Sequence, residues 1–301
     1  MRGWVLPVMR RRFPLAAAAA LLLIAGCGGS STVGPTPLPP PGEVVLVGAG
    51  DIAFCSDLAP AEATAKLLDG TSGTIFTAGD NVQGAGSLSD YRDCFAPTWG
   101  RHIQRIRPSP GNHDYDTAGG SPYYSYFGSN AGSDLGYYSY DLGTWHIISL
   151  NSNIAAGPGS PQFDWLATDL TQTGAPCTLA YWHHPLFSSG QNGATLSMQS
   201  VWHLLYAYGV DVVLNGHDHV YERFGPQDAN GVADAAHGIR QFTVGTGGAP
   251  LYPFVRVSAN SEVRGRAHGI LKLTLRSGSY GWEFMPVAGQ SLHDAGSAVC
   301  H

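Results

Sequence analysis

Two histidines spaced two residues apart follow an apolar run near residue 217. His217 and His219 belong to Gly216-His217-Asp218-His219, which comes after the apolar residues 210–214. An apolar run that ends in glycine is typical of a buried strand feeding a loop. Because residues i and i+2 of an extended segment point to the same side, both imidazoles can face one point in space. This spacing favours ligation of a metal ion by neutral imidazole.

Polar side chains also follow four other apolar runs, at residues 44–47, 74–77, 106–110 and 178–182. These side chains are Asp51, Asp80, Asn112 with His113, and His183. Each of them alone is explained by turn chemistry or local hydrogen bonding. Together with His217 and His219 they supply two carboxylates, an amide oxygen and three imidazoles, a donor set suited to divalent and trivalent metal ions.

The segments between these runs predict the elements that position them. Amphipathic or capped helices are expected at residues 59–68, 160–170 and 197–208, and an aromatic hairpin at residues 137–150. The remainder is strand-rich, at residues 240–245, 270–275 and 280–287. Strands that alternate with helices predict an α/β fold with an added antiparallel tail. Ligands gather outside the carboxyl ends of strands in open α/β sheets, where the polar groups fall here.

The order of these motifs resembles the calcineurin-like metallophosphoesterase superfamily, and within it the purple acid phosphatase branch, particularly its bacterial secreted members. The motifs are GD, GDN, GNHD, HHP and GHDH, and the resemblance covers residues 44 to about 290. It implies a four-layer α/β sandwich in which two mixed β-sheets pack face to face and are flanked by helices. It also implies two metal ions at the strand ends.

The resemblance assigns each candidate ligand a role in that dinuclear centre. Asp80 bridges both ions, Asp51 and His219 complete the first, and Asn112, His183 and His217 hold the second. His183 is preferred to His184 because the ligand of the family pattern stands two residues before the proline. The ions are Fe, Zn or Mn, and His184 becomes a residue near the site that is a candidate to contact substrate.

Two positions depart from the family pattern. Family members carry a histidine two residues after the first aspartate or, in the purple enzymes, a tyrosine three residues after the second. Here these positions hold Ala53 and Gln83. Either Gln83, a water or the substrate takes the place of the usual extra ligand of the first ion, or that ion binds weakly. Gln83 is also a candidate substrate contact. Without a tyrosinate ligand we predict a colourless protein.

The catalytic pair is predicted to be His113 and Asp114. Two cations lower the pKa of a bridging water, and the resulting hydroxide attacks phosphorus in line with the leaving oxygen. His113, next to ligand Asn112, donates a proton to that oxygen, and Asp114 orients His113 and raises its pKa. The expected activity is phosphomonoester hydrolysis of a small-molecule substrate. The alternatives are a phosphodiesterase acting on nucleotides or phospholipid head groups, and a surface lipoprotein whose metal site has decayed.

The N-terminal region is predicted to direct export. Four arginines precede an apolar run at residues 15–24 that is too short to span a bilayer comfortably. The run ends in Ile24-Ala25-Gly26-Cys27, which resembles a bacterial lipobox with Cys27 as the lipidated residue; an ordinary signal peptide is the alternative. We therefore predict a signal segment at 1–27, a Pro/Gly/Ser-rich linker at 28–42 and one metallophosphoesterase domain at 43–301. The protein contacts the membrane only through its lipid anchor and lies in the cell envelope or outside the cell.

Charge and cysteine content agree with an exported hydrolase. Removing residues 1–26 takes away four arginines and no acidic residue, so the formal net charge moves from -6 to about -10. This charge argues against a nucleic-acid-binding surface, and we expect no nucleic-acid partner. Four cysteines remain, and an oxidising compartment favours two disulfides with three connectivities. We prefer Cys55–Cys94 and Cys177–Cys300, because each pair links one half of the chain.

Overall fold

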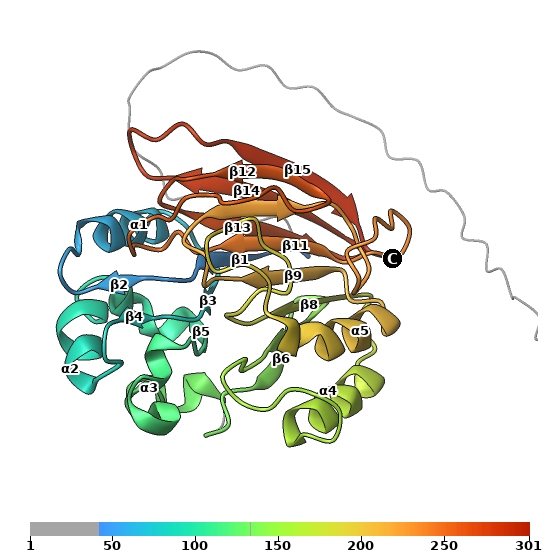
Figure 1. Ribbon diagram of the computed structural model, residues 1–301, viewed down its shortest axis with the longest axis horizontal. Helices are drawn as coiled ribbons and strands as arrows, with labels where there is room; N and C mark the ends of the chain where they lie inside the picture. The colour runs from blue at the N-terminus through green and yellow to red at the C-terminus, as the bar shows by residue number, and fades with distance from the viewer. Residues whose placement is uncertain (1–41, 133) are drawn as a thin grey trace, which may run out of the picture. The chain divides into compact units, whose positions relative to one another are not determined.

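The computed structural model describes residues 42–132 and 134–301. The predicted signal segment and lipobox, with Cys27, and the predicted linker up to residue 41 lie outside the described residues. None of the described helices has both the length and the apolar character that crossing a bilayer requires. The described part is built around two mixed β-sheets (Figure 1).

The first sheet has six strands in the order β15-β14-β13-β1-β3-β5. Its strands are β1 (Val44–Ala49), β3 (Thr74–Ala78), β5 (Ile106–Ser109), β13 (Gly269–Arg276), β14 (Ser279–Pro286) and β15 (Asp294–Val299). Strands β1, β3 and β5 run parallel, with Ala49 paired to Thr77 and Ala78 paired to Ser109. The loops that follow these three strands therefore leave the sheet at one edge.

The second sheet has seven strands in the order β12-β10-β11-β9-β8-β7-β6. Its strands are β6 (Tyr138–Leu142), β7 (Trp145–Ser149), β8 (Cys177–Tyr181), β9 (Val212–Asn215), β10 (Tyr221–Phe224), β11 (Arg240–Val244) and β12 (Ser261–Gly265). Strands β7, β8, β9 and β11 run parallel, so the loops after β8 and β9 also leave at one edge. A small parallel ribbon, β2 (Ala53–Phe54) with β4 (Val82–Gln83), lies outside both sheets.

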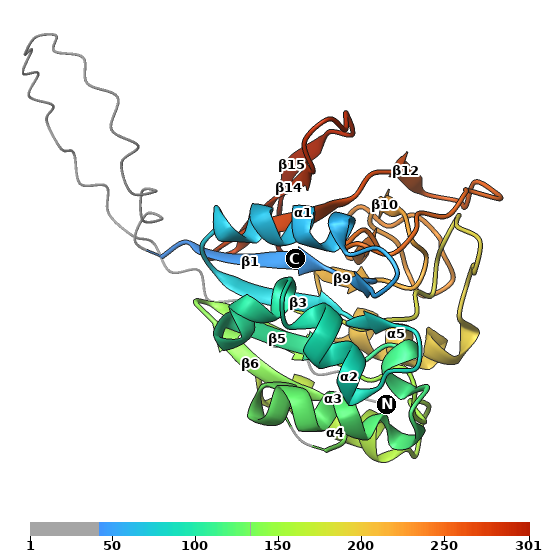
Figure 2. The ribbon, with the colours of Figure 1, turned by 90° about the vertical axis from the view of Figure 1, so that its left-hand side faces the viewer.

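Helices cover the outer faces of the two sheets. Helix α1 (Ala59–Asp69) lies beside β1 and packs on the six-stranded sheet (Figure 2). Helices α4 (Pro161–Gln172) and α5 (Gln199–Ala207) pack on the seven-stranded sheet through a cluster of buried apolar residues that includes Leu166 and Trp202. The short helix α2 (Leu88–Asp90) lies in the connection between β4 and β5, and α3 (Ser121–Phe127) lies in the connection between β5 and β6.

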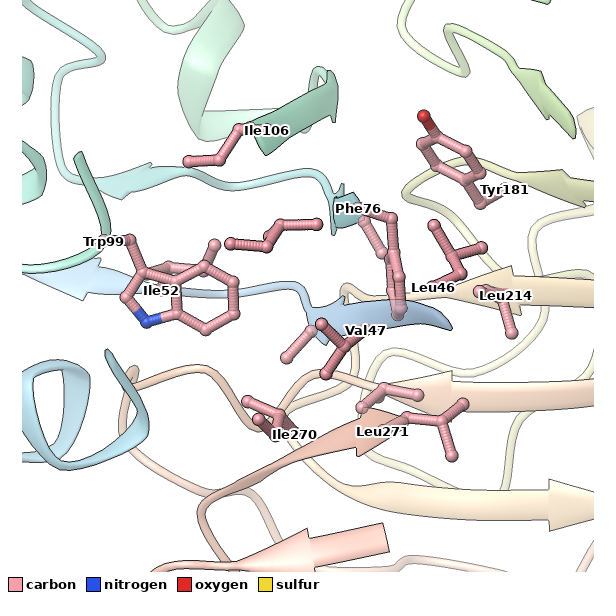
Figure 3. Packing of buried hydrophobic residues seen from close by; sticks show 14 of the residues in the cluster. Leu46, Val47, Ile52, Phe76, Trp99, Ile106, Tyr181, Leu214, Ile270 and Leu271 are labelled. Atoms are coloured by element: carbon pink, nitrogen blue, oxygen red, sulfur yellow. The ribbon is translucent and has the colours of Figure 1, made fainter. Parts of the chain in front are cut away.

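The main hydrophobic core fills the space between the sheets. Leu46 and Phe76 from the first sheet meet Tyr181 and Leu214 from the second, as Figure 3 shows. The rings of Phe76 and Tyr181 have centroids 5.9 Å apart. Burial of these side chains holds the two sheets together, at about 1.5–3 kcal/mol for each large apolar side chain. The predicted four-layer arrangement, helix–sheet–sheet–helix, is confirmed.

Most predicted elements are present within a few residues of their expected bounds, including the hairpin β6–β7. Ser160 caps α4 as expected, accepting a hydrogen bond from the backbone N–H of Phe163 at 3.3 Å. Strands β10, β12 and β15, the ribbon β2–β4 and the short helices α2 and α3 were not predicted from the sequence. The structure contains both preferred disulfides, Cys55–Cys94 and Cys177–Cys300. Disulfides are typical of proteins of oxidising compartments.

Candidate metal centre

The six predicted ligands follow the carboxyl ends of five strands and meet where the strand ends of the two sheets lie close together. They are Asp51 after β1, Asp80 after β3, Asn112 after β5, His183 after β8, and His217 and His219 after β9. Ligand atoms of Asp51, Asp80 and His183 lie within 4.8 Å of one another. All three of these side chains are buried. The structure therefore brings together the complete set that the sequence singled out.

One half of the centre is organised around Nε2 of His183. This nitrogen lies 3.3 Å from Oδ2 of Asp80, 3.1 Å from Oδ1 of Asn112 and 3.2 Å from Nδ1 of His217. Nδ1 of His183 lies 2.8 Å from the carbonyl oxygen of Ala78, which can only accept, so Nδ1 carries the proton. The lone pair of Nε2 therefore points toward the other donor atoms.

The other half of the centre is the pair Asp51 and His219. Nδ1 of His219 donates to the carbonyl oxygen of Pro250 at 2.7 Å, which leaves the lone pair of Nε2 directed at Oδ1 of Asp51, 3.2 Å away. Oδ1 of Asp51 is buried and accepts no hydrogen bond from the described residues, while Oδ2 accepts from the backbone N–H of His217 at 2.9 Å. Two lone pairs therefore face each other in a buried place.

The backbone at three of the candidate ligands has an unusual conformation. Asp51, Asp80 and His217 have positive φ angles of 59°, 48° and 70°. Non-glycine residues with positive φ cost conformational energy and gather at functional sites. Gly111 permits the close approach of the neighbouring loop, because a Cβ atom there would collide with the backbone nitrogen of Asp80. The strand ends are thus held in conformations that the packing of the loops enforces.

This donor set fits two cations. A metal-ligating imidazole usually gives its second N–H to a backbone carbonyl, as His183 and His219 do here. Carboxylate, amide oxygen and imidazole suit divalent and trivalent ions, and a cation between Asp51 and His219 would satisfy the unpaired Oδ1. Asp80 has Oδ2 facing His183 and lies next to Asp51, which is the position that a bridging carboxylate requires.

Buried charges shift the pKa values of the same residues. Burial acts to lower the pKa of His183, but the charges of Asp80 and Asp51 and the hydrogen bonds to Asp80 and the Ala78 carbonyl together outweigh it and raise the pKa to about 9. Burial raises the pKa of Asp80, yet the positive charges of His183 and His113 hold that pKa well below its ordinary value. Burial and the charge of His183 lower the pKa of His217 to about 4. The centre therefore concentrates negative charge on carboxylates, where a cation competes with protons for the same lone pairs.

His113 lies at the edge of the centre, but Asp114 does not orient it. The backbone N–H of His113 donates to Oδ1 of Asp80 at 2.8 Å, and its Nδ1 lies 2.8 Å from Oδ2 of Asp116 and 3.2 Å from the carbonyl oxygen of Gly84. Burial acts to lower the pKa of His113, but Asp80 and the hydrogen bond to Asp116 outweigh it and raise the pKa. The predicted orienting role of Asp114 is therefore wrong, and Asp116 occupies that place.

The carboxylate of Asp114 turns into the protein instead. It accepts hydrogen bonds from the backbone N–H of Gly111 at 2.7 Å, from the backbone and side-chain N–H groups of Asn81 at 3.2 and 3.0 Å, and from the hydroxyl of Tyr91. Burial and the charge of Asp80 raise the pKa of Asp114 to about 6. The short 3₁₀ turn at His113–Tyr115 places residues three apart on one side, so Asp116 rather than its neighbour meets the ring. That spacing of three was the signal in the sequence that could have identified Asp116.

The two candidate substrate contacts differ in position. The ring of His184 lies 4.4 Å from that of His217, and its Nδ1 contacts Oγ of Ser152 at 2.8 Å. Burial and the charges of His183 and His217 lower the pKa of His184 to about 2, so this ring is neutral. Gln83 is buried and its Nε2 lies 3.4 Å from Oδ2 of Asp80. Gln83 thus contacts the candidate bridging carboxylate.

One aromatic neighbour of the centre was not identified from the sequence. The ring of Tyr252 stacks on the ring of His219, with centroids 3.9 Å apart and planes inclined by 13°. Its backbone N–H donates to the carbonyl oxygen of His219 at 3.0 Å. The segment around Tyr252 carries no recognisable motif, so Tyr252 could not be placed beside the candidate ligands from the sequence.

Comparison with known proteins agrees with this geometry. The family model described as Calcineurin-like phosphoesterase matches residues 50–221, which include all six candidate ligands. The chain belongs to this family of metallophosphoesterases.

Within the family, the chain is similar to purple acid phosphatases. It is 31% identical to "Purple acid phosphatase 15" of Arabidopsis thaliana over 145 residues, which cover 42% of this chain and 27% of that protein. It is 30% identical to "Purple acid phosphatase 22" of the same plant over 254 residues, covering 74% of this chain and 54% of that protein. The matched segments thus span about half or less of the length of these curated relatives.

A solved structure shares the fold. The purple acid phosphatase PPD1 from seeds of yellow lupin (Lupinus luteus) superposes with a TM-score of 0.73 at 20% sequence identity, covering 85% of this chain and 54% of that chain. These relationships support the purple acid phosphatase-like branch.

Proposed function

We propose that this protein is a dinuclear-metal phosphoester hydrolase and that its first activity is hydrolysis of phosphomonoesters. The convergence of six donor side chains on one buried place carries the proposal, above all the unpaired Oδ1 of Asp51 facing the lone pair of His219. Asp80 would be shared by the two ions, Asp51 and His219 would hold the first, and Asn112, His183 and His217 would hold the second. The metals are drawn from Fe, Zn and Mn.

The chain's own residues divide the chemistry of phosphoester cleavage between them. When bound, two cations neutralise the charge of the phosphate oxygens and lower the pKa of the attacking water. His113 supplies the proton that the leaving oxygen needs, and its raised pKa favours the protonated form. Nδ1 of His113 is held by Asp116 and by the carbonyl oxygen of Gly84, so Nε2 is the nitrogen that gives the proton. His184, neutral and fixed by Ser152, offers a hydrogen bond to the substrate.

The place of action is proposed from the N-terminal sequence. We infer that the chain is exported and anchored to a membrane through a lipid on Cys27, with residues 28–42 as a tether. The two disulfides support export, because such bonds form in oxidising compartments. Labelling with a radioactive fatty acid tests the anchor, which a Cys27→Ser variant should lose.

Metal analysis and hydrolysis of two chromogenic esters test the proposal together. The purified protein is stripped with a chelator, and Fe, Zn or Mn is added back while bound metal is counted. We expect about two ions per chain and metal-dependent hydrolysis of p-nitrophenyl phosphate, faster than that of bis(p-nitrophenyl) phosphate. Asp80→Asn should reduce the bound metal and the activity, whereas His203→Ala, which changes an exposed histidine outside the centre, should leave both intact.

Each of the other possible results would indicate a different function. Faster hydrolysis of the bis ester would identify a phosphodiesterase. Two bound ions without hydrolysis of any phosphoester at any pH would identify the decayed lipoprotein that the Ala53 and Gln83 departures motivate. A failure of the chain to bind any of the metals would contradict the centre itself.

A further inference from the structure

The segment at residues 250–258 forms one wall of the candidate metal centre. It begins at Pro250, whose carbonyl oxygen accepts from His219, and continues to Tyr252, whose ring covers that same histidine. Val255 and Val257 further along the segment are largely exposed, at 57% and 70%. The segment therefore leads from a candidate ligand out to the solvent.

The loop after β8 holds this segment in place. The backbone N–H groups of Val255 and Arg256 both point at the carbonyl oxygen of Ser189, at 3.1 and 3.4 Å. Oγ of Ser258 donates to the carbonyl oxygen of Ser188 at 2.8 Å, and Nε of Arg256 donates to the same oxygen at 3.0 Å. Arg256 thus has a fixed position although its side chain is exposed.

That position lies over a loop that is hydrogen-bonded to the segment after β9. The guanidinium lies directly over Gly193, where an added Cβ atom would collide with Nη2 of Arg256. The backbone N–H of Gly193 donates to Oδ2 of Asp218 at 3.2 Å, and Nδ2 of the adjacent Asn192 donates to the carbonyl oxygen of His217 at 2.8 Å. Two residues of one loop therefore link Arg256 to the segment that carries His217 and His219.

The guanidinium has unused hydrogen-bonding capacity. Among the described residues the side chain of Arg256 forms no ion pair, and its one side-chain hydrogen bond is donated by Nε, so Nη1 and Nη2 remain available. Other arginines close to the sheets, such as Arg223 and Arg101, are neutralised by two carboxylates each. A planar guanidinium with two free amino groups matches a phosphate group in a bidentate manner.

We propose that Arg256 binds a second phosphate group on the substrate, so that the site prefers phosphoesters whose leaving group is itself phosphorylated. The inference rests on the proposed hydrolase function. The first phosphate lies at the metal centre, and the second reaches the rim formed by Arg256 and Gly193. Tyr252 provides a flat surface between the two positions for the body of the leaving group.

Two sugar phosphates that differ by one phosphate test this specificity. The ratio of kcat/KM for glucose 1,6-bisphosphate to that for glucose 6-phosphate is measured for the metal-loaded protein and for Arg256→Ala. We expect the ratio to fall about tenfold in the variant, the effect of one partly exposed charge-assisted contact. Arg256→Lys should recover part of it, because the charge remains while the bidentate geometry is lost.

Arg266→Ala is the matched control. Arg266 is also exposed, makes no ion pair among the described residues, and touches the same segment through the carbonyl oxygen of Leu251 at 3.4 Å. Its removal changes the net charge by the same amount. An equal fall of the ratio in Arg266→Ala would show a general charge effect and overturn the role of Arg256, as would an unchanged ratio in Arg256→Ala.

Calorimetric binding separates this inference from the proposed function. The same two sugars are titrated into the metal-loaded protein and into Arg256→Ala. Tighter binding of the bisphosphate that depends on Arg256, without turnover of either sugar or of p-nitrophenyl phosphate, would support the anion site and contradict the hydrolase. Turnover without any such dependence would support the hydrolase and contradict the anion site.

Discussion

Replacing Asp114 by alanine should destabilise the fold, whereas replacing Asp116 should not. The carboxylate of Asp114 is fully buried and accepts from Gly111, twice from Asn81, and from Tyr91. Each buried donor left without a partner costs about 1–3 kcal/mol. Because the loops relax and water enters, the simple sum is an upper bound, and we expect a net loss of about 3–5 kcal/mol.

The comparison with Asp116 makes this prediction specific. The side chain of Asp116 is 48% exposed and contacts only the ring of His113 among the described ion pairs, so its loss should cost less than about 1 kcal/mol. Asp114→Asn keeps an accepting oxygen and should fall between the two. Asp114 is thus expected to stabilise the loop. Asp116, which contacts the predicted acid His113, is expected to affect catalysis.

Urea unfolding of the metal-stripped variants at pH 7.5 measures these differences without the contribution of metal binding. For a domain of this size the expected loss in Asp114→Ala corresponds to a fall in Tm of roughly 10 °C. A change below about 1 kcal/mol in Asp114→Ala, together with a larger one in Asp116→Ala, would refute the assignment of the buried hydrogen bonds.

Four further predictions concern the catalytic acid His113, the pH dependence of turnover, the colour of the iron-loaded protein and the pH dependence of stability. His113→Ala should retain bound metal by elemental analysis but lose roughly 100-fold in turnover, and unchanged turnover would remove it from the mechanism. Asp116→Asn should move the alkaline fall of kcat/KM to lower pH, because the carboxylate that raises the pKa of His113 is gone; a pH–rate profile that does not move contradicts this. The iron-loaded protein should be colourless, while Gln83→Tyr should gain visible absorption if position 83 adjoins the first ion. Burial acts to lower the pKa of His146, but the hydrogen bonds to Asp169 and Asp141 and the charges of these two carboxylates together outweigh it and raise the pKa in the folded state. The stabilisation from His146 is therefore complete below its unfolded pKa of about 6.5 and lost as the pH rises through the raised value. Urea unfolding should show a larger loss for His146→Gln at pH 5.5 than at pH 9, and equal losses would argue against it.

The sequence by itself predicted the candidate ligand set and the α/β class, and its family resemblance implied the four layers. Polar residues directly after apolar runs recur five times, four of them behind a glycine, and the helix predicted at residues 59–68 favours a parallel arrangement of the two strands on either side of it. In a parallel sheet all carboxyl ends lie at one edge, so Asp51, Asp80 and Asn112 had to be neighbours once the strands were recognised. Local chemistry of this kind needs no knowledge of distant contacts.

Only the tertiary structure decided which carboxylate meets His113 and which arginine lies at the rim. Asp114 and Asp116 are the same residue type within three positions of His113, so the sequence does not distinguish them. The short 3₁₀ turn directs them differently, and the buried donors of Gly111 and Asn81 bind the carboxylate of Asp114. The side chain of Arg256 is positioned by a hydrogen bond to the carbonyl oxygen of Ser188, 68 positions earlier in the chain. Such contacts depend on how loops from different strands pack against one another, and the free energy of that packing is not encoded in any short segment.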